Sequence, residues 1–309
     1  MIDGFLNINK PAGISSFDAV KIVLGEILEG KRPEKRVKIG HAGTLDPIAE
    51  GVLVLALNRA SKLISRVQDQ KKTYIATFLL GISSPSDDTE TEATQLPDAP
   101  IPSREEIEAI LPEFLGRIMQ RPPIYSAVKI QGKRAYDLAR SGKAVEIASR
   151  PVDIYSLKII NYEYPNLQLE ICCGSGVYVR SLGRDMALRL GTAAIMSALT
   201  RSAVGVFHLE DALDIRPRFD TDAPPLSRPG CLSFVRPLFD AVPNLPRVEY
   251  SHDEIERMKN GLPVFRTGFP PESEAVVVGP DHEFLGIVKM GRNEQFRSVL
   301  HFANDFLSR

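Results

Sequence analysis

The stretch GHAGTLDP, residues 40–47, decides the fold, together with the run GVLVLAL at residues 51–57 just behind it. Glycines let the backbone turn tightly or approach another molecule closely. Pro47 restricts Asp46 to extended geometry and ends any helix there, whereas the unbroken apolar run is typical of a fully buried strand. The sequence therefore places a carboxylate, Asp46, and an imidazole, His41, on a glycine-rich loop attached to the core, where binding and catalytic groups concentrate. Alternatively, Asp46 is an ordinary turn former that hydrogen-bonds its own backbone.

The composition is typical of a soluble globular chain, and its length allows two domains, or one large and one small. Of the 309 residues, 43 % are apolar and 25 % are charged, which is an ordinary balance. The sequence has no run of about 18 apolar residues, the length needed to cross a membrane, and the first residues lack the features of a signal peptide. Three cysteines fit a reducing cytosol rather than a disulfide framework, so we expect a cytoplasmic protein. His and Cys do not cluster at metal-ligand spacing, which predicts no metal.

Charge is segregated along the chain although the net charge is only −1. Residues 117–158 hold nine Lys or Arg and three Asp or Glu, while acidic residues dominate from 87 to 113. A local basic segment can supply contacts to phosphates. A solvated surface with scattered charges explains the same count equally well.

Local signals predict the elements of the first half. Ser15 and Asp18 form a helix-capping pair ahead of a helix with one apolar face. Residues 71–81 are rich in β-branched and aromatic side chains and predict a strand. Tyr74 lies at the start of that strand, where it either packs in the sheet or reaches out of the core. Residues 83–102 are expected to form a loop, followed by a helix capped by Ser103 and reaching about Leu115.

The second half continues with a strand, a helix and a small β-rich unit. Residues 167–173 alternate between apolar and polar and predict a strand. Arg180 follows at a strand-to-helix junction, where it either reaches into a cleft or forms a structural ion pair. Residues 216–229 are predicted to be a loop or linker. From Pro246 a unit of about 60 residues begins, and a unit of that size gains stability by docking on its neighbour. Its expected elements are a strand at 248–250, a helix capped by Ser251 and ending at Gly261, and strands at 275–278 and 284–290.

Four spaced motifs resemble those of one family, the bacterial tRNA pseudouridine(55) synthases of the TruB type. They are NKPxGxSS at residues 9–16, GHxGTLDPxAxG at 40–51, PPxYSAxKxxGxxAY at 122–136 and CxxGxYVR at 173–180. The motifs occur in the family's order, and the resemblance covers residues 4 to about 213. Two departures are Ser175, where many relatives carry Lys, and an apparent extra connector at 216–230.

The resemblance implies an α+β fold. Its central sheet is mixed and largely antiparallel, helices flank it, and a small β-rich PUA-like domain follows at the C-terminus. The expected catalytic domain covers residues 1–235 and carries an RNA-binding insert at about 104–150. The PUA-like RNA-binding domain is expected at 246–309.

The resemblance also implies an isomerase that converts a T-loop uridine of tRNA, at position 55, to pseudouridine. The N1–C1′ bond breaks, the flipped-out base rotates, and C5 bonds to C1′. The family's essential aspartate matches Asp46, whose carboxylate could stabilise charge at C1′, attack it or remove the 2′-proton. Arg180 would pair with Asp46 and keep it ionised and oriented, and Tyr74 would stack on the base and take up the C5 proton.

Five further residues are implied as substrate or RNA contacts. His41 would fill the gap left by the flipped base, and Leu199 would line the pocket. Lys10, Lys129 and Tyr178 belong to the motifs as RNA-binding residues. No cofactor is expected because no redox or group-transfer step occurs. The expected partner is the T-stem-loop of tRNA, bound by a monomer without a protein partner or a membrane.

Two other functions remain as alternatives. The basic segment and the C-terminal unit would also suit a tRNA-folding chaperone, an RNA-binding protein with incidental catalysis. A glycoside hydrolase built on Asp46 is disfavoured, because no second carboxylate is identifiable as its acid partner.

Overall fold

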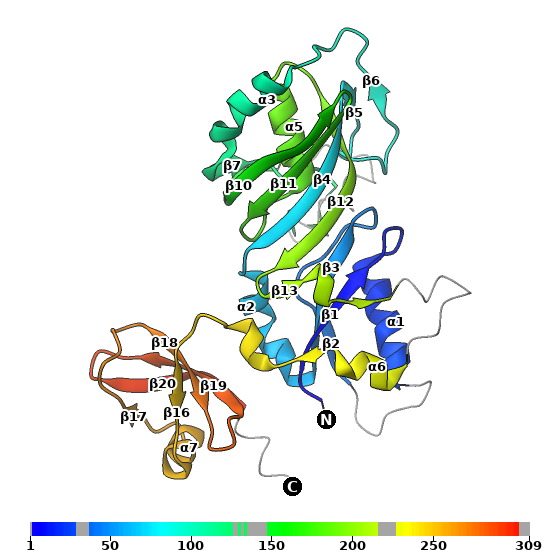
Figure 1. Ribbon diagram of the computed structural model, residues 1–309. Helices are drawn as coiled ribbons and strands as arrows, with labels where there is room; N and C mark the ends of the chain where they lie inside the picture. Colours follow the sequence, from blue (N-terminus) through cyan, green and yellow to red (C-terminus); the bar gives the residue numbers. More distant parts are fainter. Residues whose placement is uncertain are drawn as a thin grey trace.

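The computed structural model describes residues 2–28, 37–125, 129–130, 133–134, 147–215 and 227–302. Within them the chain forms two main sheets, one of eleven strands and one of five (Figure 1). Most of the connector expected at 216–230 lies outside the described residues.

The eleven-stranded sheet is mixed and largely antiparallel. Its main path runs in the order β14-β1-β3-β12-β4-β11-β10-β7. The β1–β14 and β3–β12 pairs are parallel, and the other pairs along this path are antiparallel. The strands of the path are β1 Gly4–Lys10, β3 Glu50–Leu57, β4 Lys72–Leu80, β7 Gly116–Gln120, β10 Arg150–Glu163, β11 Asn166–Cys173, β12 Ala194–Val204 and β14 Leu213–Asp214. Three short strands pair beside it, β2 Ile39–His41 on β3, β13 Phe207–His208 on β12 and β15 Val235–Arg236 on β1.

Helices flank this sheet, as predicted for the α+β class. The α-helices are α1 Ser16–Leu28, α2 Ile64–Gln68, α3 Arg104–Ile110, α5 Val179–Arg189 and α6 Arg228–Ser233. The 3₁₀ turns are η1 Asn58–Leu63, η2 Leu111–Phe114, η3 Leu209–Asp211 and η5 Leu238–Ala241. The predicted caps form, because Ser15 Oγ accepts from the amide of Asp18 at 3.1 Å and Ser103 Oγ accepts from that of Glu106 at 3.2 Å.

Strand β3 is buried on both faces, which explains its unbroken apolar run. Leu53, Leu55 and Leu57 point into one core cluster, shared with α1 and with strands β4 and β11. Val52 and Val54 point into a second cluster on the opposite face. Every side chain of the strand after Gly51 thus meets apolar neighbours, and the strand provides a rigid base for the loop that precedes it.

The C-terminal unit is a five-stranded sheet in the order β16-β18-β19-β20-β17. Its elements are β16 Arg247–Glu249, α7 His252–Lys259, β17 Val264–Phe265, β18 Glu274–Val278, β19 Phe284–Met290 and β20 Gln295–His301. Phe284, Ile287 and Phe302 join the second core cluster together with Phe5 of β1. An ion pair of 2.8 Å between Arg66 Nη1 and Glu274 Oε2 ties the unit to α2. The small sheet is therefore stabilised by docking on its neighbour.

Two parts of the fold differ from the sequence-based expectations. Residues 83–102 are not all loop, because β5 Ile82–Ser83 pairs with β6 Thr94–Gln95 and Asp88 bridges to Met196. Strands β10 and β12 were not anticipated. In the region of the expected insert, β8 Lys129–Ile130 pairs with β9 Lys133–Arg134. The domain limits, 1–235 and 246–309, stay a prediction.

Candidate active site

The loop that carries Asp46 is held in place by four backbone contacts. Ser16, the first residue of α1, clamps Leu45: its hydroxyl accepts from the Leu45 amide at 2.8 Å and donates to the Leu45 carbonyl at 3.0 Å. The amide of Gly13 donates to the Pro47 carbonyl at 2.8 Å, and that of Ala49 to the Asp46 carbonyl at 3.0 Å. The loop is thus a fixed turn, and the Asp46 side chain on it is 37 % exposed.

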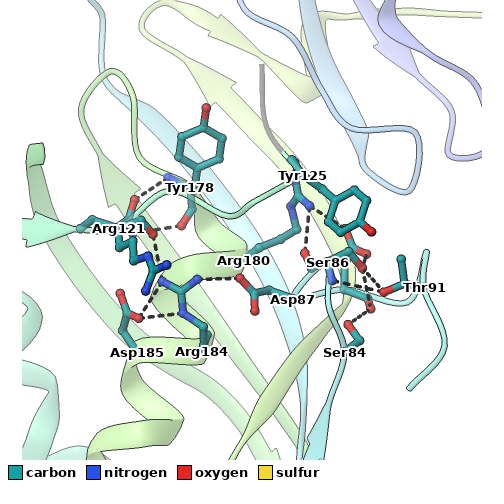
Figure 2. Close-up of polar contacts among 12 residues, drawn as sticks. Ser84, Ser86, Asp87, Thr91, Arg121, Tyr125, Tyr178, Arg180, Arg184 and Asp185 are labelled. Atoms are coloured by element: carbon teal, nitrogen blue, oxygen red, sulfur yellow. Dashed lines mark hydrogen bonds and ion pairs between the residues drawn. The ribbon is translucent and has the colours of Figure 1, made fainter. Parts of the chain in front are cut away.

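Arg180 binds Asp46 from the buried side. It lies in the first turn of α5 and is 6 % exposed, and its Nη2 is 3.0 Å from Asp46 Oδ2. The same guanidinium donates to the carbonyls of Ser86 and Tyr125 at 3.0 and 3.1 Å. Figure 2 shows Arg180 reaching between Tyr125 and Ser86. The structure therefore brings together Asp46 and Arg180, which are 134 residues apart in the chain.

A second carboxylate on Arg180, that of Asp88, was missed from the sequence. Its Oδ2 lies 3.0 Å from Arg180 Nη1, and the side chain is fully buried. Oδ1 accepts from the Ser86 hydroxyl at 2.5 Å and from the Glu90 amide at 2.9 Å. The guanidinium is thus bracketed by one buried and one partly exposed carboxylate. The only sequence signal for this role of Asp88 is the group of Ser and Thr residues around it, which favours a local turn.

A parallel ion pair lies one helical turn further along α5. Arg184 Nη1 contacts Asp87 Oδ2 at 2.8 Å, and Nη2 donates to the Arg121 carbonyl at 2.9 Å (Figure 2). Burial raises the pKa of Asp87, and the Arg184 charge opposes that effect. Arg180 and Arg184 share one face of α5 because residues four apart on a helix are neighbours. Their ion pairs with Asp88 and Asp87 dock the 83–102 segment on that helix.

Tyr74 lies in the first core cluster, which also contains the predicted pocket residue Leu199. It is 9 % exposed and stands directly opposite Arg201 in the β4–β12 register. Burial raises the pKa of the Tyr74 hydroxyl, while the Arg201 charge opposes that effect. Arg201 itself is a buried strand residue that sequence reasoning missed.

His41 and Lys10 flank the loop. His41 lies in β2, and its buried Nδ1 has no hydrogen-bond partner among the described residues. Burial and the Arg201 charge lower its pKa. Lys10 is fully buried, and its Nζ donates to the carbonyls of Pro11 and Ile14, each at 2.8 Å. Burial lowers the pKa of Lys10 to about 8. Lys10 therefore supports the turn that contacts the loop, and its contact with RNA stays a prediction.

Tyr178 and Lys129 complete the predicted set. The side-chain amide of Gln120 holds the Tyr178 backbone at two points, accepting from its amide at 2.8 Å and donating to its carbonyl at 3.1 Å. The Arg150 guanidinium lies 5.2 Å from the centre of the Tyr178 ring, and Figure 2 shows this ring pointing away from Arg184. The side chain of Lys129 lies outside the described residues.

Across the described ranges, no group of three or more His, Cys, Asp or Glu side chains could hold a metal ion. In the same residues, none of the helices has the length and apolar character needed to cross a membrane.

Comparison with known proteins identifies the family. Residues 31–179 match the TruB family pseudouridylate synthase (N terminal domain). The tRNA pseudouridine synthase B of Rhodopirellula baltica is 38 % identical over 269 residues, covering 87 % of this chain and 77 % of that protein. That of Dehalococcoides mccartyi is 38 % identical over 289 residues, covering 93 % and 92 %.

Solved structures confirm the fold class. A Cbf5-Nop10-Gar1 complex contains a chain with a TM-score of 0.66 and 22 % identity, covering 99 % of this chain and 81 % of that one. An H/ACA RNP bound to a substrate RNA containing 2′-deoxyuridine gives 0.68 and 21 %, covering 97 % and 84 %. At these identities the likeness concerns the fold alone. The nearly full-length matches at 38 % identity establish more, and the chain belongs to the TruB family of pseudouridylate synthases.

Proposed function

We propose that this chain is a tRNA pseudouridine synthase that isomerises uridine 55 in the T-loop. The observation that carries the proposal is the Asp46 carboxylate, which is partly exposed on a fixed loop and paired with the buried Arg180. The relatives that match most of the chain are named tRNA pseudouridine synthase B.

The proposed reaction moves one glycosidic bond within the substrate. The N1–C1′ bond breaks, the uracil rotates in the site, and C5 forms the new bond to C1′. The proton leaves C5 and N1 gains one, so the product is an isomer and no cofactor is consumed. Positive charge develops at C1′ as the first bond breaks, and a carboxylate is the group that glycosidases use at such a centre.

The described residues divide the work of this reaction between them. Asp46 faces C1′, and Arg180 fixes one of its oxygens so that the other remains open to the ribose. Tyr74 forms the floor under the uracil and takes up the C5 proton, with Leu199 beside it. His41, on the neighbouring strand β2, occupies the gap that the flipped base leaves in the RNA.

We further propose that a monomer binds the T-stem-loop in the cytoplasm without a protein partner. The insert at about 104–150 and the unit at 246–309 would bind the RNA backbone. Arg117, Arg121, Arg150 and Lys158 supply cations on and beside β7 and β10. Phosphate contacts make such binding strongly dependent on salt.

Tritium release from a T-stem-loop carrying 5-³H-uridine tests the proposal. The wild-type protein should release tritium, and the same RNA with cytidine at position 55 should give none. Asp46→Asn should abolish release, whereas Asp98→Asn, an exposed carboxylate in the acidic segment, should leave it unchanged. Full activity of Asp46→Asn would refute the proposal.

The same proteins separate this function from a tRNA-folding chaperone. The chaperone would be favoured if the wild-type protein releases no tritium and Asp46→Asn refolds misfolded tRNA at the same rate as the wild type. Absence of tRNA binding at low salt would contradict both functions, because phosphate contacts dominate affinity there.

A further inference from the structure

Arg201 is the largest of the fully buried side chains in the described residues, at 2 % exposed. A guanidinium is rarely buried unless all its donors are engaged. Here Nε donates to the Val52 carbonyl at 2.8 Å, Nη2 to that of Gly43 at 3.0 Å and Nη1 to that of Thr44 at 3.4 Å. The Gly43 and Thr44 carbonyls belong to the loop that carries Asp46.

The same guanidinium also reaches the strand that carries Tyr74. Arg201 and Tyr74 are paired Cα partners in the antiparallel β4–β12 register, so their side chains lie on one face of the sheet. Burial raises the pKa of the Tyr74 hydroxyl, and the Arg201 charge opposes that effect. One side chain thus bonds to the Asp46 loop and lies directly across the sheet from Tyr74, on a separate segment of the chain.

The backbone around Arg201 is built for this close approach. Gly51 pairs with Arg201 where β3 runs parallel to β12. A Cβ on Gly51 would lie 2.3 Å from the Arg201 carbonyl oxygen, and its φ of +101° is unfavourable for other residues. β12 therefore comes against the start of β3 only because residue 51 has no side chain.

We propose that Arg201 is a positioning residue that sets the distance and orientation between Asp46 and Tyr74. The inference rests on the proposed isomerisation, in which Asp46 acts at C1′ and Tyr74 at C5 of the same uridine. Asp46 acts on C1′ and Tyr74 acts on C5 at successive steps. The distance between the two side chains therefore has to suit the uracil after it has rotated. A planar guanidinium that donates in several fixed directions suits this task better than an ammonium.

Single-turnover tritium release at saturating T-stem-loop tests the proposal with Arg201→Met, which keeps the bulk of the side chain. We expect the rate to fall about 100-fold, as for a small misplacement of reacting groups, with tRNA affinity changed by less than about twofold because no phosphate contact is lost. In a Tyr74→Phe background, the further loss caused by Arg201→Met should shrink to about tenfold, since contacting residues are coupled.

Three results would overturn the proposal. One is an Arg201→Met rate within about threefold of wild type, because misplaced reacting groups should cost far more. Another is the same fold-loss in both backgrounds, which would show that Arg201 does not act through Tyr74. The third is a loss confined to tRNA affinity. If Arg201→Met does not fold, Arg201→Lys is measured instead, because it retains the charge without the planar guanidinium. A wild-type rate in Arg201→Lys would also overturn the proposal.

Two controls keep the interpretation specific. Arg66→Met removes another half-buried guanidinium, the one paired with Glu274 at the C-terminal unit, and should leave the rate unchanged. Failure of the wild-type protein to release tritium would refute the proposed function itself, whereas an active wild type with a fully active Arg201→Met refutes only the role of Arg201.

Discussion

Replacing Asp88 by asparagine tests the buried side of the Arg180 network. The carboxylate uses one oxygen for Arg180 Nη1 and the other for the Ser86 hydroxyl and the Glu90 amide. An asparagine has one acceptor oxygen and one NH₂ group in the same space. In either orientation of the amide, its NH₂ faces a group that can only donate, the guanidinium on one side or the Glu90 amide on the other.

The magnitude follows from burial. Removing one partner of a buried ion pair lowers the free energy of unfolding by about 3–5 kcal/mol. Because Asp88→Asn retains one acceptor oxygen, we expect a loss of about 3 kcal/mol. For a chain of this size, 1 kcal/mol shifts the melting temperature by about 2–4 °C, so we expect a decrease of about 6–12 °C. Arg180 would keep only Asp46 as a charged partner, which is 37 % exposed, and a poorly oriented Asp46 should slow the reaction by about 100-fold.

The adjacent residue supplies a matched control. Asp87 is paired with Arg184, which is partly exposed and has a second carboxylate partner, Asp185. Asp87→Asn should therefore lower the free energy of unfolding by only about 1 kcal/mol and leave the rate unchanged. Differential scanning calorimetry and single-turnover tritium release measure the two effects. An Asp88→Asn protein that melts and reacts like wild type would refute the claim that Arg180 needs its buried carboxylate.

Three other perturbations have definite expected outcomes. Gly51→Ala should lower the free energy of unfolding by more than about 1 kcal/mol, because of its positive φ and the contact with Arg201, and an unchanged urea midpoint would contradict this. Lys10 has a folded pKa of about 8 against an ordinary value of 10.5, so the unfolded chain binds more protons between these values and stability rises with pH across that window. Urea titrations should show a smaller rise for Lys10→Met, and equal slopes would disprove it. Phe302→Ala removes a fully buried ring from the cluster that the two sheets share, so it should cost about 3–5 kcal/mol. Limited proteolysis should then cleave the C-terminal unit earlier, and an unchanged digestion rate would count against a shared core.

Local patterns predicted those parts of the fold whose cause is local. The apolar run of β3 indicates burial on two faces, and the cores on both sides of the strand account for it. The caps at Ser103 and Ser251 bond to amides only three residues away, so nearby residues suffice to predict them. Alternation predicted β11 because one of its faces is buried throughout.

The missed features depend on contacts that are distant in sequence. Two register shifts in the β10–β11 pairing interrupt the alternation of β10, so no period of two marks that strand. The partners Asp88 and Arg180 are 92 residues apart. An arginine in a strand sequence usually indicates a position that faces solvent. Arg201 is buried because β3 runs alongside β12 at this point. The candidate residues came from motif resemblance, whereas the contacts that hold them required the structure.

The pairing of Gln120 with Arg150 has a consequence for how this family can vary. These residues are opposite partners in the β7–β10 ladder, so the chain leaves the sheet and returns to it at a single point. The 29 residues between them are closed at both ends by this pairing, and the entropic cost of closing such a segment grows only slowly with its length. Their number can therefore change over evolution at small thermodynamic cost and without moving a strand. The Gln120 amide, bound to the Tyr178 backbone, keeps the ends of this segment beside the first turn of α5, so segments of different length would begin and end at the same place relative to Asp46.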